Sequence, residues 1–433
     1  MTNFDGKRIR TIQDSSRKPE YVYPWESMTL AVLIILLSPF TSYYLNAAAF
    51  VICFFRAVRY GTVTFSTDYC ILATVSFVFQ LNGSIILLPY LCLAVAIWFV
   101  CQGGIPSDGA TIMLIVLLDY LLVRMNGDYN NLVLCFSQFV LLRELLQKQN
   151  RSAAVLTSKL FCISLLISSL YAYVFRNTSQ LIALKGKEAP AYLMSTQTRF
   201  YGLFRDPNYY MALLVIAIAL LIKLRVSNEL KRIPFFVMIS TVIIFGLLTY
   251  SKTFLLLMAL ICVIYVLLQI RKRKYFLAFG LIAVISLVVA ISLQIPDSPL
   301  QIILYRFSIA TNMDDLTTGR SELYSRYIRA ITAGVKPFFF GYGLNAEYLV
   351  LSPHNLYLEI LYYLGAFGMA IFVTAIGACI SITRLEIIPT NNESFLMRYF
   401  PLISIAVLFF SLSGMFSPST YVMLFLALVS MPI

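Results

Sequence analysis

The sequence has few charged residues and a single histidine. Of its 433 residues, 12% are charged and 60% are hydrophobic, whereas soluble globular domains carry about 25% charged residues. No soluble core of this size could bury so much apolar sequence, which excludes a soluble globular protein. One histidine cannot build a histidine-rich metal site, and we expect no metal and no cofactor.

We expect neither a disulfide framework nor a cleavable leader. Its eight cysteines form no CxxC pair and lie mostly in or at the ends of apolar segments, as expected of packing residues. The first 26 residues are polar and mixed in charge, with no short apolar core followed by a cleavage site. We therefore expect residues 1–26 to form a cytoplasmic N-terminal tail.

Long apolar runs fill the rest of the chain. A transmembrane helix needs about 20 mostly apolar residues, and these runs are continuous, unlike the alternating strands of a membrane barrel. The sequence predicts an all-α, polytopic membrane protein of about 12–14 transmembrane helices. The predicted segments are 28–45, 44–59, 68–81, 84–101, 109–124, 129–146, 158–176, 208–225, 233–250, 253–270, 275–293, 354–383, 398–415 and 418–433.

The net charge of +13 indicates orientation and not nucleic-acid binding. If the N-terminal tail is cytoplasmic, most lysines and arginines fall on the inside as the segments are counted along the chain. Two long polar stretches, about 177–207 and 294–353, then lie outside. The second includes 320–330, whose helical spacing predicts short amphipathic helices. We expect residues 27–433 to form one transmembrane catalytic domain with these two external loops.

Basic residues on the outside are the first functional signal. Arg199, Arg205, Lys252, Arg320 and His354 all fall near predicted outer membrane boundaries. Any one of them could be a solvated side chain or contact lipid head groups. As a set they favour a phosphate-bearing ligand at the membrane surface, because guanidinium groups pair bidentately with phosphate oxygens.

Two short motifs contain the first three of these cations. In the stretch 199–208, Asp206-Pro-Asn is typical of a capping turn before a helix, but two arginines flanking Gly202 suggest a close approach of the backbone to another group. The stretch 249–253 is either a tight outer turn or a place where Lys252 joins the arginines.

The late loop contributes two more residues. Thr317-Thr-Gly-Arg320 is typical of a helix start, where the helix dipole does not favour a positive charge, so Arg320 is a functional candidate. His354 is either a hydrogen-bonded residue at a helix end or a base, since its reference pKa lies near 6.5.

These elements together resemble the O-antigen polymerase/ligase superfamily (Wzy and WaaL) over about residues 195–370. His354-Asn355 is followed by nine residues and then by Gly365-x-x-Gly368, and Arg199-x-x-x-Leu203 fits a ligase element. The stretch Arg199 to Asn208, Thr318-Gly-Arg320 and Gly341-x-Gly343 resemble capsule and O-antigen polymerases.

The resemblance implies a GT-C-like fold and a metal-independent, inverting glycosyltransferase on the outer face of the bacterial cytoplasmic (inner) membrane. We expect it to polymerise oligosaccharide repeat units into O-antigen or capsular polysaccharide. Its substrates would be undecaprenyl-diphosphate-linked oligosaccharide donors and acceptors, and the flippase and chain-length regulator of the pathway would be partners. We assign the diphosphate to Arg199, Arg205, Lys252 and Arg320, and the base to His354. Supporting roles go to Asn355, Asp206, Tyr324 and Gly202.

Two alternatives stay open. An O-antigen ligase would move the glycan to lipid A-core instead of another repeat unit. A transporter or flippase of lipid-linked sugars would carry its charges within the spans, and here the apolar runs hold almost none apart from Asp119.

Overall fold

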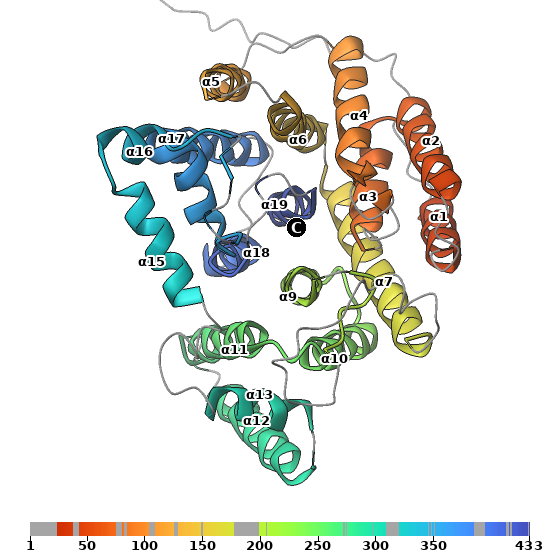
Figure 1. The fold of residues 1–433 in the computed structure, drawn as a ribbon. Helices are drawn as coiled ribbons and strands as arrows, with labels where there is room; N and C mark the ends of the chain where they lie inside the picture. The colour runs from red at the N-terminus through yellow and green to blue at the C-terminus, as the bar shows by residue number, and fades with distance from the viewer. Residues whose placement is uncertain are drawn as a thin grey trace, which may run out of the picture.

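The described part of the chain is almost entirely helical (Figure 1). The computed structural model describes residues 24–37, 43–74, 80–81, 85–103, 109–124, 129–148, 150–176, 199–204, 206–271, 273, 275–296, 298–308, 320–344, 346–347, 349, 351–384, 395–412, 415, 418–431 and 433. The apolar helices are α1 (Pro24–Leu37), α2 (Tyr43–Tyr60), α3 (Thr62–Ala73), α4 (Leu87–Gly103), α5 (Gly109–Val123), α6 (Tyr129–Lys148), α7 (Arg151–Val174), α9 (Pro207–Val226), α10 (Arg232–Leu248), α11 (Lys252–Arg271), α12 (Tyr275–Gln294), α17 (Leu356–Arg384), α18 (Phe395–Leu408) and α19 (Pro418–Val429).

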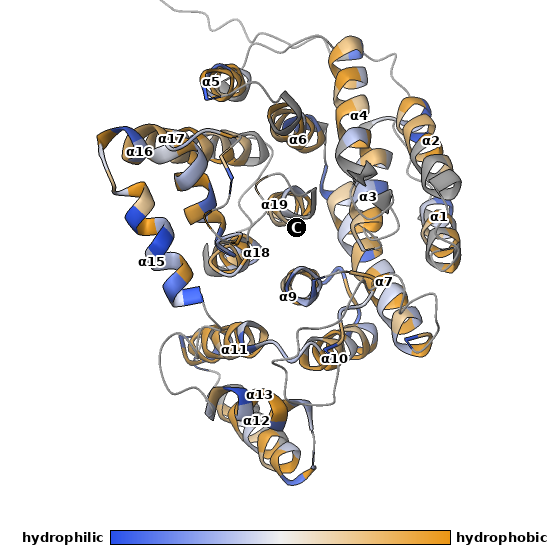
Figure 2. Cartoon of the chain, viewed as in Figure 1, coloured by the Kyte–Doolittle hydropathy of each residue, from blue (hydrophilic) through white to orange (hydrophobic). Residues whose placement is uncertain are grey.

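These helices agree with the prediction of a helical membrane protein, since each of the predicted apolar segments overlaps one of them. Within the described ranges, four helices are long and apolar enough to cross a membrane by length and composition: α7, α9, α11 and α17 up to Ser381. Most of the shorter ones are equally apolar, and Figure 2 shows hydrophobic residues along most of the bundle.

One boundary was predicted wrongly. The segments 68–81 and 84–101 were expected to be helical throughout, but β1 (Gln80–Leu81) pairs antiparallel with β2 (Ile85–Ile86). The helix before them begins earlier than expected, at Thr62, and ends at Ala73. Asn82-Gly83 stands between the two strands in the sequence, and this dipeptide is a strong hairpin signal.

The centre of the bundle is α9. Its side chains are buried almost without interruption from Tyr210 to Leu224, and α7, α10, α18 and α19 pack around it. Figure 1 shows α9 and α19 end-on, with the other helices around them. A helix that is apolar on all sides in this way suits the interior of a membrane bundle.

Contacts between helices join ends that the charge pattern predicts to lie on the same side. At the predicted inner end, Lys223 Nζ donates to the carbonyl of Met431 over 3.5 Å. At the predicted outer end, Arg124 Nη2 donates to the carbonyl of Gly341 over 2.7 Å, and the N–H of Phe200 donates to the carbonyl of Leu248.

Three short helices lie in the long connection between α12 and α17: α13 (Pro299–Ser308), α15 (Arg320–Ile331) and α16 (Val335–Phe340). The expected amphipathic helix is α15, which buries Leu323, Tyr327 and Ile331. Its residues Glu322, Arg326 and Arg329 are exposed. Figure 2 shows that α15 carries more hydrophilic residues than the helices around it.

Helix α17 is bent at Gly365, whose φ is +69°. Three successive carbonyls before the bend accept hydrogen bonds from outside the helix, so the bend leaves none of them unpaired. The pairs are Tyr342 N–H to Tyr362 O (2.8 Å), Gly343 N–H to Tyr363 O (2.9 Å) and the Tyr120 hydroxyl to Leu364 O.

Glycines allow the backbones of α16 and α17 to touch. A Cβ on Gly341 (φ +67°) would lie 2.5 Å from the Tyr363 carbonyl, and a Cβ on Gly365 would lie 2.4 Å from the Phe339 carbonyl. Only glycine fits both the space and the left-handed backbone here. These two glycines of the family-like motif therefore pack the end of α16 against α17 around its bend at Gly365.

Candidate functional site

The start of α15 is attached to the end of α18. Arg320, the first residue of α15, lies with Nη1 3.4 Å from the Ser411 carbonyl. One turn later, the Tyr324 hydroxyl donates to the Phe410 carbonyl over 2.8 Å and lies 3.3 Å from the His354 carbonyl. These contacts bring Arg320 and Tyr324 to the segment that contains His354.

His354 and Asn355 precede α17 directly. His354 adopts φ +48°, a conformation uncommon for residues other than glycine. Asn355 is buried, and its Oδ1 accepts the N–H of Leu358 over 3.1 Å, as a helix cap does. The conformation of His354 and the cap at Asn355 therefore define the backbone at the start of α17.

The electrostatics of the site link three of the predicted residues. Burial lowers the pKa of His354, the positive charge of Arg320 lowers it further, and the carboxylate of Asp206 acts in the opposite direction. Burial raises the pKa of Tyr324, while the charge of Arg320 and hydrogen bonds with Asn355 and Arg320 oppose the rise. Near neutral pH the imidazole is therefore uncharged and able to accept a proton.

The segment before α9 forms the capping turn that its sequence predicts. Asp206 is the N-cap of α9 and accepts the N–H of Asn208 over 2.7 Å. Gly202 has φ +55°, and a Cβ there would lie 2.8 Å from the Tyr210 ring. Among the described neighbours, the group that approaches Gly202 is thus an aromatic side chain of the protein. Arg205 lies outside the described residues.

Arg199 and Lys252 meet at the turn between α10 and α11. Arg199 Nε donates to the Thr249 carbonyl over 2.8 Å. Lys252 begins α11, and its Nζ lies 5.3 Å from the centre of the Phe307 ring on α13. Arg306, also on α13, donates to the Tyr250 carbonyl. The α10–α11 turn therefore gathers a second set of cations at the end of the bundle where Asp206 starts α9.

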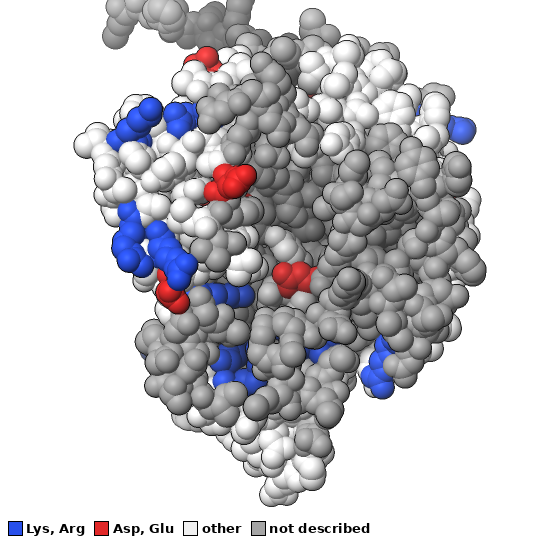
Figure 3. Space-filling view, viewed as in Figure 1, with Lys and Arg blue, Asp and Glu red and all other residues white. Residues whose placement is uncertain are grey.

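Figure 3 shows the charged side chains from the direction of Figure 1. Lys and Arg gather over α15 and in the region of α11, and acidic side chains lie both near the middle of this face and beside the basic side chains of α15. The predicted residues thus form two groups. One contains Arg320, Tyr324, His354 and Asn355, with Asp206 within electrostatic reach, and the other contains Arg199 and Lys252.

Sequence reasoning missed Glu359. This side chain is 1% exposed, lies one turn after Asn355, and its Oε2 accepts the N–H of Met415 over 3.1 Å. An acidic residue in the first turn of an apolar membrane helix is the signal that could have identified it. Glu359 fixes the connection after α18, whose carbonyls hold Arg320 and Tyr324.

A neutral imidazole within electrostatic reach of a permanently charged guanidinium can serve two purposes in one reaction. The imidazole can take a proton from a hydroxyl group, and the guanidinium can bind and stabilise phosphate oxygens. Over the described ranges of the chain, no group of three His, Cys, Asp or Glu side chains is placed to hold a metal ion.

One comparison with known proteins gives a match. Residues 235–373 match the family model described as O-Antigen ligase. No curated protein and no solved structure matches the chain significantly. The matched segment runs from the start of α10 into α17 and contains Lys252, Arg320, His354 and Glu359, whereas Arg199 and Asp206 precede it.

Proposed function

We propose that the chain is a polysaccharide polymerase of the O-antigen ligase and polymerase superfamily, which the match of residues 235–373 to the O-Antigen ligase model supports. It joins polyprenyl-diphosphate-linked oligosaccharide repeat units into O-antigen or capsular polysaccharide. The observation that supports this best is the placement of Arg320 beside His354, whose pKa is lowered.

The proposed reaction is a direct displacement. A sugar hydroxyl of the acceptor attacks the anomeric carbon of the donor, and the new C–O bond forms as the bond to the lipid diphosphate breaks. His354 takes the hydroxyl proton, and the diphosphate leaves with the bonding electron pair. Attack from the face opposite the leaving group inverts the anomeric carbon.

The leaving diphosphate needs positive charge as it departs. Arg320, Arg199 and Arg205 bind it in this proposal, and Lys252 assists. Positively charged donors that are aimed at developing charge lower the barrier in the way that a metal ion does in other transferases. The two groups of cations would hold the diphosphate between α15 and the α10–α11 turn, above the start of α9.

The remaining predicted residues act by positioning the base and the diphosphate-binding cations. Tyr324 and Asn355 hold the segment that carries His354, and Asp206 opposes the fall in its pKa. Gly202 packs the Arg199 segment against Tyr210. They are positioning residues, since no proposed bond is made or broken at them.

The proposed location is the outer face of the bacterial cytoplasmic membrane. Positive-inside counting supports it, because the site lies at the end of the bundle with fewer basic residues in its short turns. There the enzyme would meet lipid-linked donor and acceptor, and work with the flippase and chain-length regulator of its pathway. A GT-C-like arrangement of one transmembrane catalytic domain over residues 27–433 completes the proposal.

O-antigen ligase activity is the second candidate, favoured by the description of the matched family and by His354-Asn355 with its glycines. Deleting the gene separates the two. Loss of a polymerase leaves caps of a single repeat unit, whereas loss of a ligase leaves polymer on the undecaprenyl carrier. Single-repeat caps support the polymerase, and carrier-bound polymer overturns it.

A transporter of lipid-linked sugars is the alternative from another class. Purified protein in detergent offers only one compartment, so a pure transporter produces no new chemical species there. Longer lipid-linked oligosaccharides from a single-repeat donor support the enzyme. Unchanged donor, with folded protein and both substrates present, contradicts it.

A further inference from the structure

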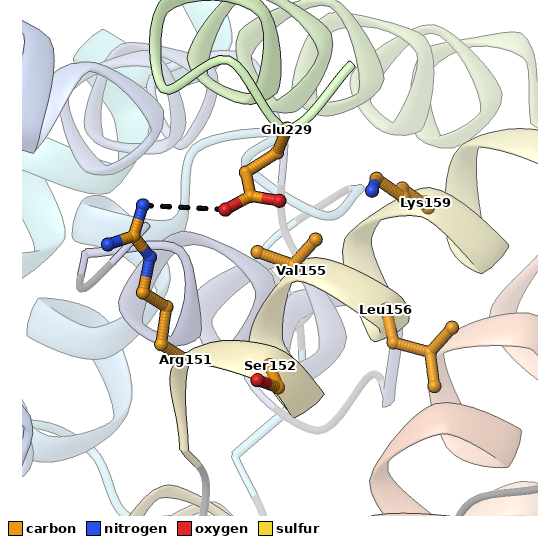
Figure 4. Close-up of a pocket in the computed structure, with 6 residues that line it drawn as sticks. All are labelled: Arg151, Ser152, Val155, Leu156, Lys159 and Glu229. Atoms are coloured by element: carbon orange, nitrogen blue, oxygen red, sulfur yellow. Dashed lines mark hydrogen bonds and ion pairs between the residues drawn. The ribbon is translucent and has the colours of Figure 1, made fainter.

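A second polar site lies at the opposite end of the bundle from the candidate functional site. Here α7 begins beside the connection from α9 to α10, and Figure 4 shows a pocket of about 330 Å³ between them. Its lining residues are Arg151, Ser152, Val155, Leu156, Lys159 and Glu229. Because α9 has 20 residues and rises about 1.5 Å per residue, the pocket is roughly 30 Å from Asp206.

The pocket has two cations and one carboxylate. Arg151 Nη2 lies 3.4 Å from Glu229 Oε1, and both side chains are partly exposed, at 53% and 33%. Lys159 also faces the pocket, and in Figure 4 the Glu229 carboxylate lies between the two basic side chains. Among the residues that the structure describes, no ion pair joins Lys159 to an acidic side chain. The pocket therefore keeps one excess positive charge.

The floor of the pocket is apolar. Val155 is buried, and Leu156 packs against a small cluster of Ala31, Ile71 and Leu160 between α1, α3 and α7. Lys159 lies eight residues after Arg151, which is about 12 Å further along the helix. A lysine placed that far along the helix can lay its methylene chain along the apolar surface and keep its ammonium group at the membrane surface.

We propose that this pocket binds the head group of a phosphatidylethanolamine molecule of the inner leaflet. Arg151 and Lys159 hold its phosphate, Glu229 accepts hydrogen bonds from its primary ammonium, and Val155 and Leu156 face its glycerol and first methylene groups. Each charged group of the lipid meets an opposite charge, since the two cations face the phosphate and the one carboxylate faces the ammonium. Basic pockets between helices on the cytoplasmic side are suited to lipid head groups.

In this proposal, Glu229 is the group that selects phosphatidylethanolamine over phospholipids with other head groups. A choline head group has no N–H to donate to the carboxylate, and a glycerol head group leaves the lipid anionic, so that Glu229 repels it. A free phosphate ion would use the two cations but neither the apolar floor nor Glu229. This site is independent of the proposed glycosyl transfer.

The test uses the purified full chain, stripped of lipid and reconstituted with equal parts of phosphatidylethanolamine, phosphatidylglycerol and phosphatidylcholine. Native mass spectrometry then identifies the retained lipid. We expect phosphatidylethanolamine to be retained preferentially. Lys159→Gln should weaken its retention about fivefold, the worth of one basic side chain near a lipid surface, and Lys231→Gln, an exposed lysine outside the pocket, should not.

Glu229→Gln gives the sharper result, because it removes the selecting group and keeps both cations. We expect this variant to retain phosphatidylglycerol at least as well as phosphatidylethanolamine. Equal effects of Lys159→Gln and Lys231→Gln, or an unchanged lipid preference in Glu229→Gln, overturn the proposal. So does displacement of the lipid by millimolar inorganic phosphate, which would indicate a site for free anions. Unchanged thermal melting shows that each variant is folded.

Discussion

The hydroxyl group of Tyr324 lies 2.8 Å from the backbone carbonyl of Phe410, so helix α15 is fixed to the end of α18 by a side chain one turn after Arg320. The same hydroxyl lies 3.3 Å from the carbonyl of His354. A single phenol thus connects the helix that carries the guanidinium with the segment that carries the imidazole.

Tyr324→Phe should slow transfer while the protein stays folded. One hydrogen bond contributes about 0.5–1.5 kcal/mol, which corresponds to a loss of roughly three- to tenfold if it acts mainly on the geometry of the site. The rate of glycan transfer by purified protein measures the effect. Tyr305→Phe, an exposed tyrosine on α13, is the matched control and should keep the full rate. Equal rates for the two variants would remove Tyr324 from the site.

Arg320→Gln should lower the rate by about 100- to 1,000-fold, the usual effect of removing one donor to developing charge. The control is Arg329→Gln, because Arg329 lies on the same helix, is exposed, and donates to the Ser325 carbonyl within that helix. Both variants lose one positive charge. If they lose activity equally, the effect is one of total charge and not of a diphosphate contact.

The rate should fall on the acid side as His354 takes up a proton. Burial and the charge of Arg320 place the pKa of His354 below 6.5, so the base form persists at neutral pH and is lost as the pH falls through that lowered value. Asp206 raises the pKa, so Asp206→Asn should move the acid limb to lower pH. Asparagine also caps helices, which keeps the fold intact.

The pH–rate profiles of the wild type and of Asp206→Asn provide this measurement. Glu322→Gln, which removes an exposed carboxylate of α15, is the control and should leave the acid limb in place. A shift of the Asp206→Asn profile to higher pH would contradict the assigned electrostatics.

Gly341→Ala and Gly365→Ala should each destabilise the protein. The left-handed backbone alone costs a non-glycine residue about 1–2 kcal/mol, and the new Cβ would lie within 2.6 Å of backbone atoms of the facing segment. Gly377→Ala, where a Cβ meets nothing within 4 Å, should not destabilise α17. Thermal melting in detergent compares the three variants, and equal melting midpoints would mean that the α16–α17 contact is looser than described.

Much of the fold follows from the sequence, because lipid as solvent makes apolar continuity a strong signal. Every predicted span overlaps a helix, and α15 has the amphipathic pattern that 320–330 predicts. The β1–β2 pair was missed because short apolar runs do not distinguish strand from helix by periodicity alone.

The candidate site was predictable in part. The presence of basic residues near predicted outer membrane boundaries led us to predict Arg199, Lys252, Arg320 and His354. All four lie at one end of the bundle. The sequence could not predict which groups meet, since the contact of Tyr324 with Phe410 joins residues 86 positions apart. Glu359 was missed because its role depends on Met415, a partner that only the fold reveals.

The most direct test of the proposed chemistry compares purified wild-type protein with His354→Ala, given a single-repeat lipid diphosphate donor in detergent. Mass spectrometry of the lipid-linked products measures turnover. We predict longer glycans and free lipid diphosphate from the wild type, and a loss of about 100- to 10,000-fold in His354→Ala, the usual contribution of a general base. Full turnover by folded His354→Ala would contradict the assignment of His354 as the base.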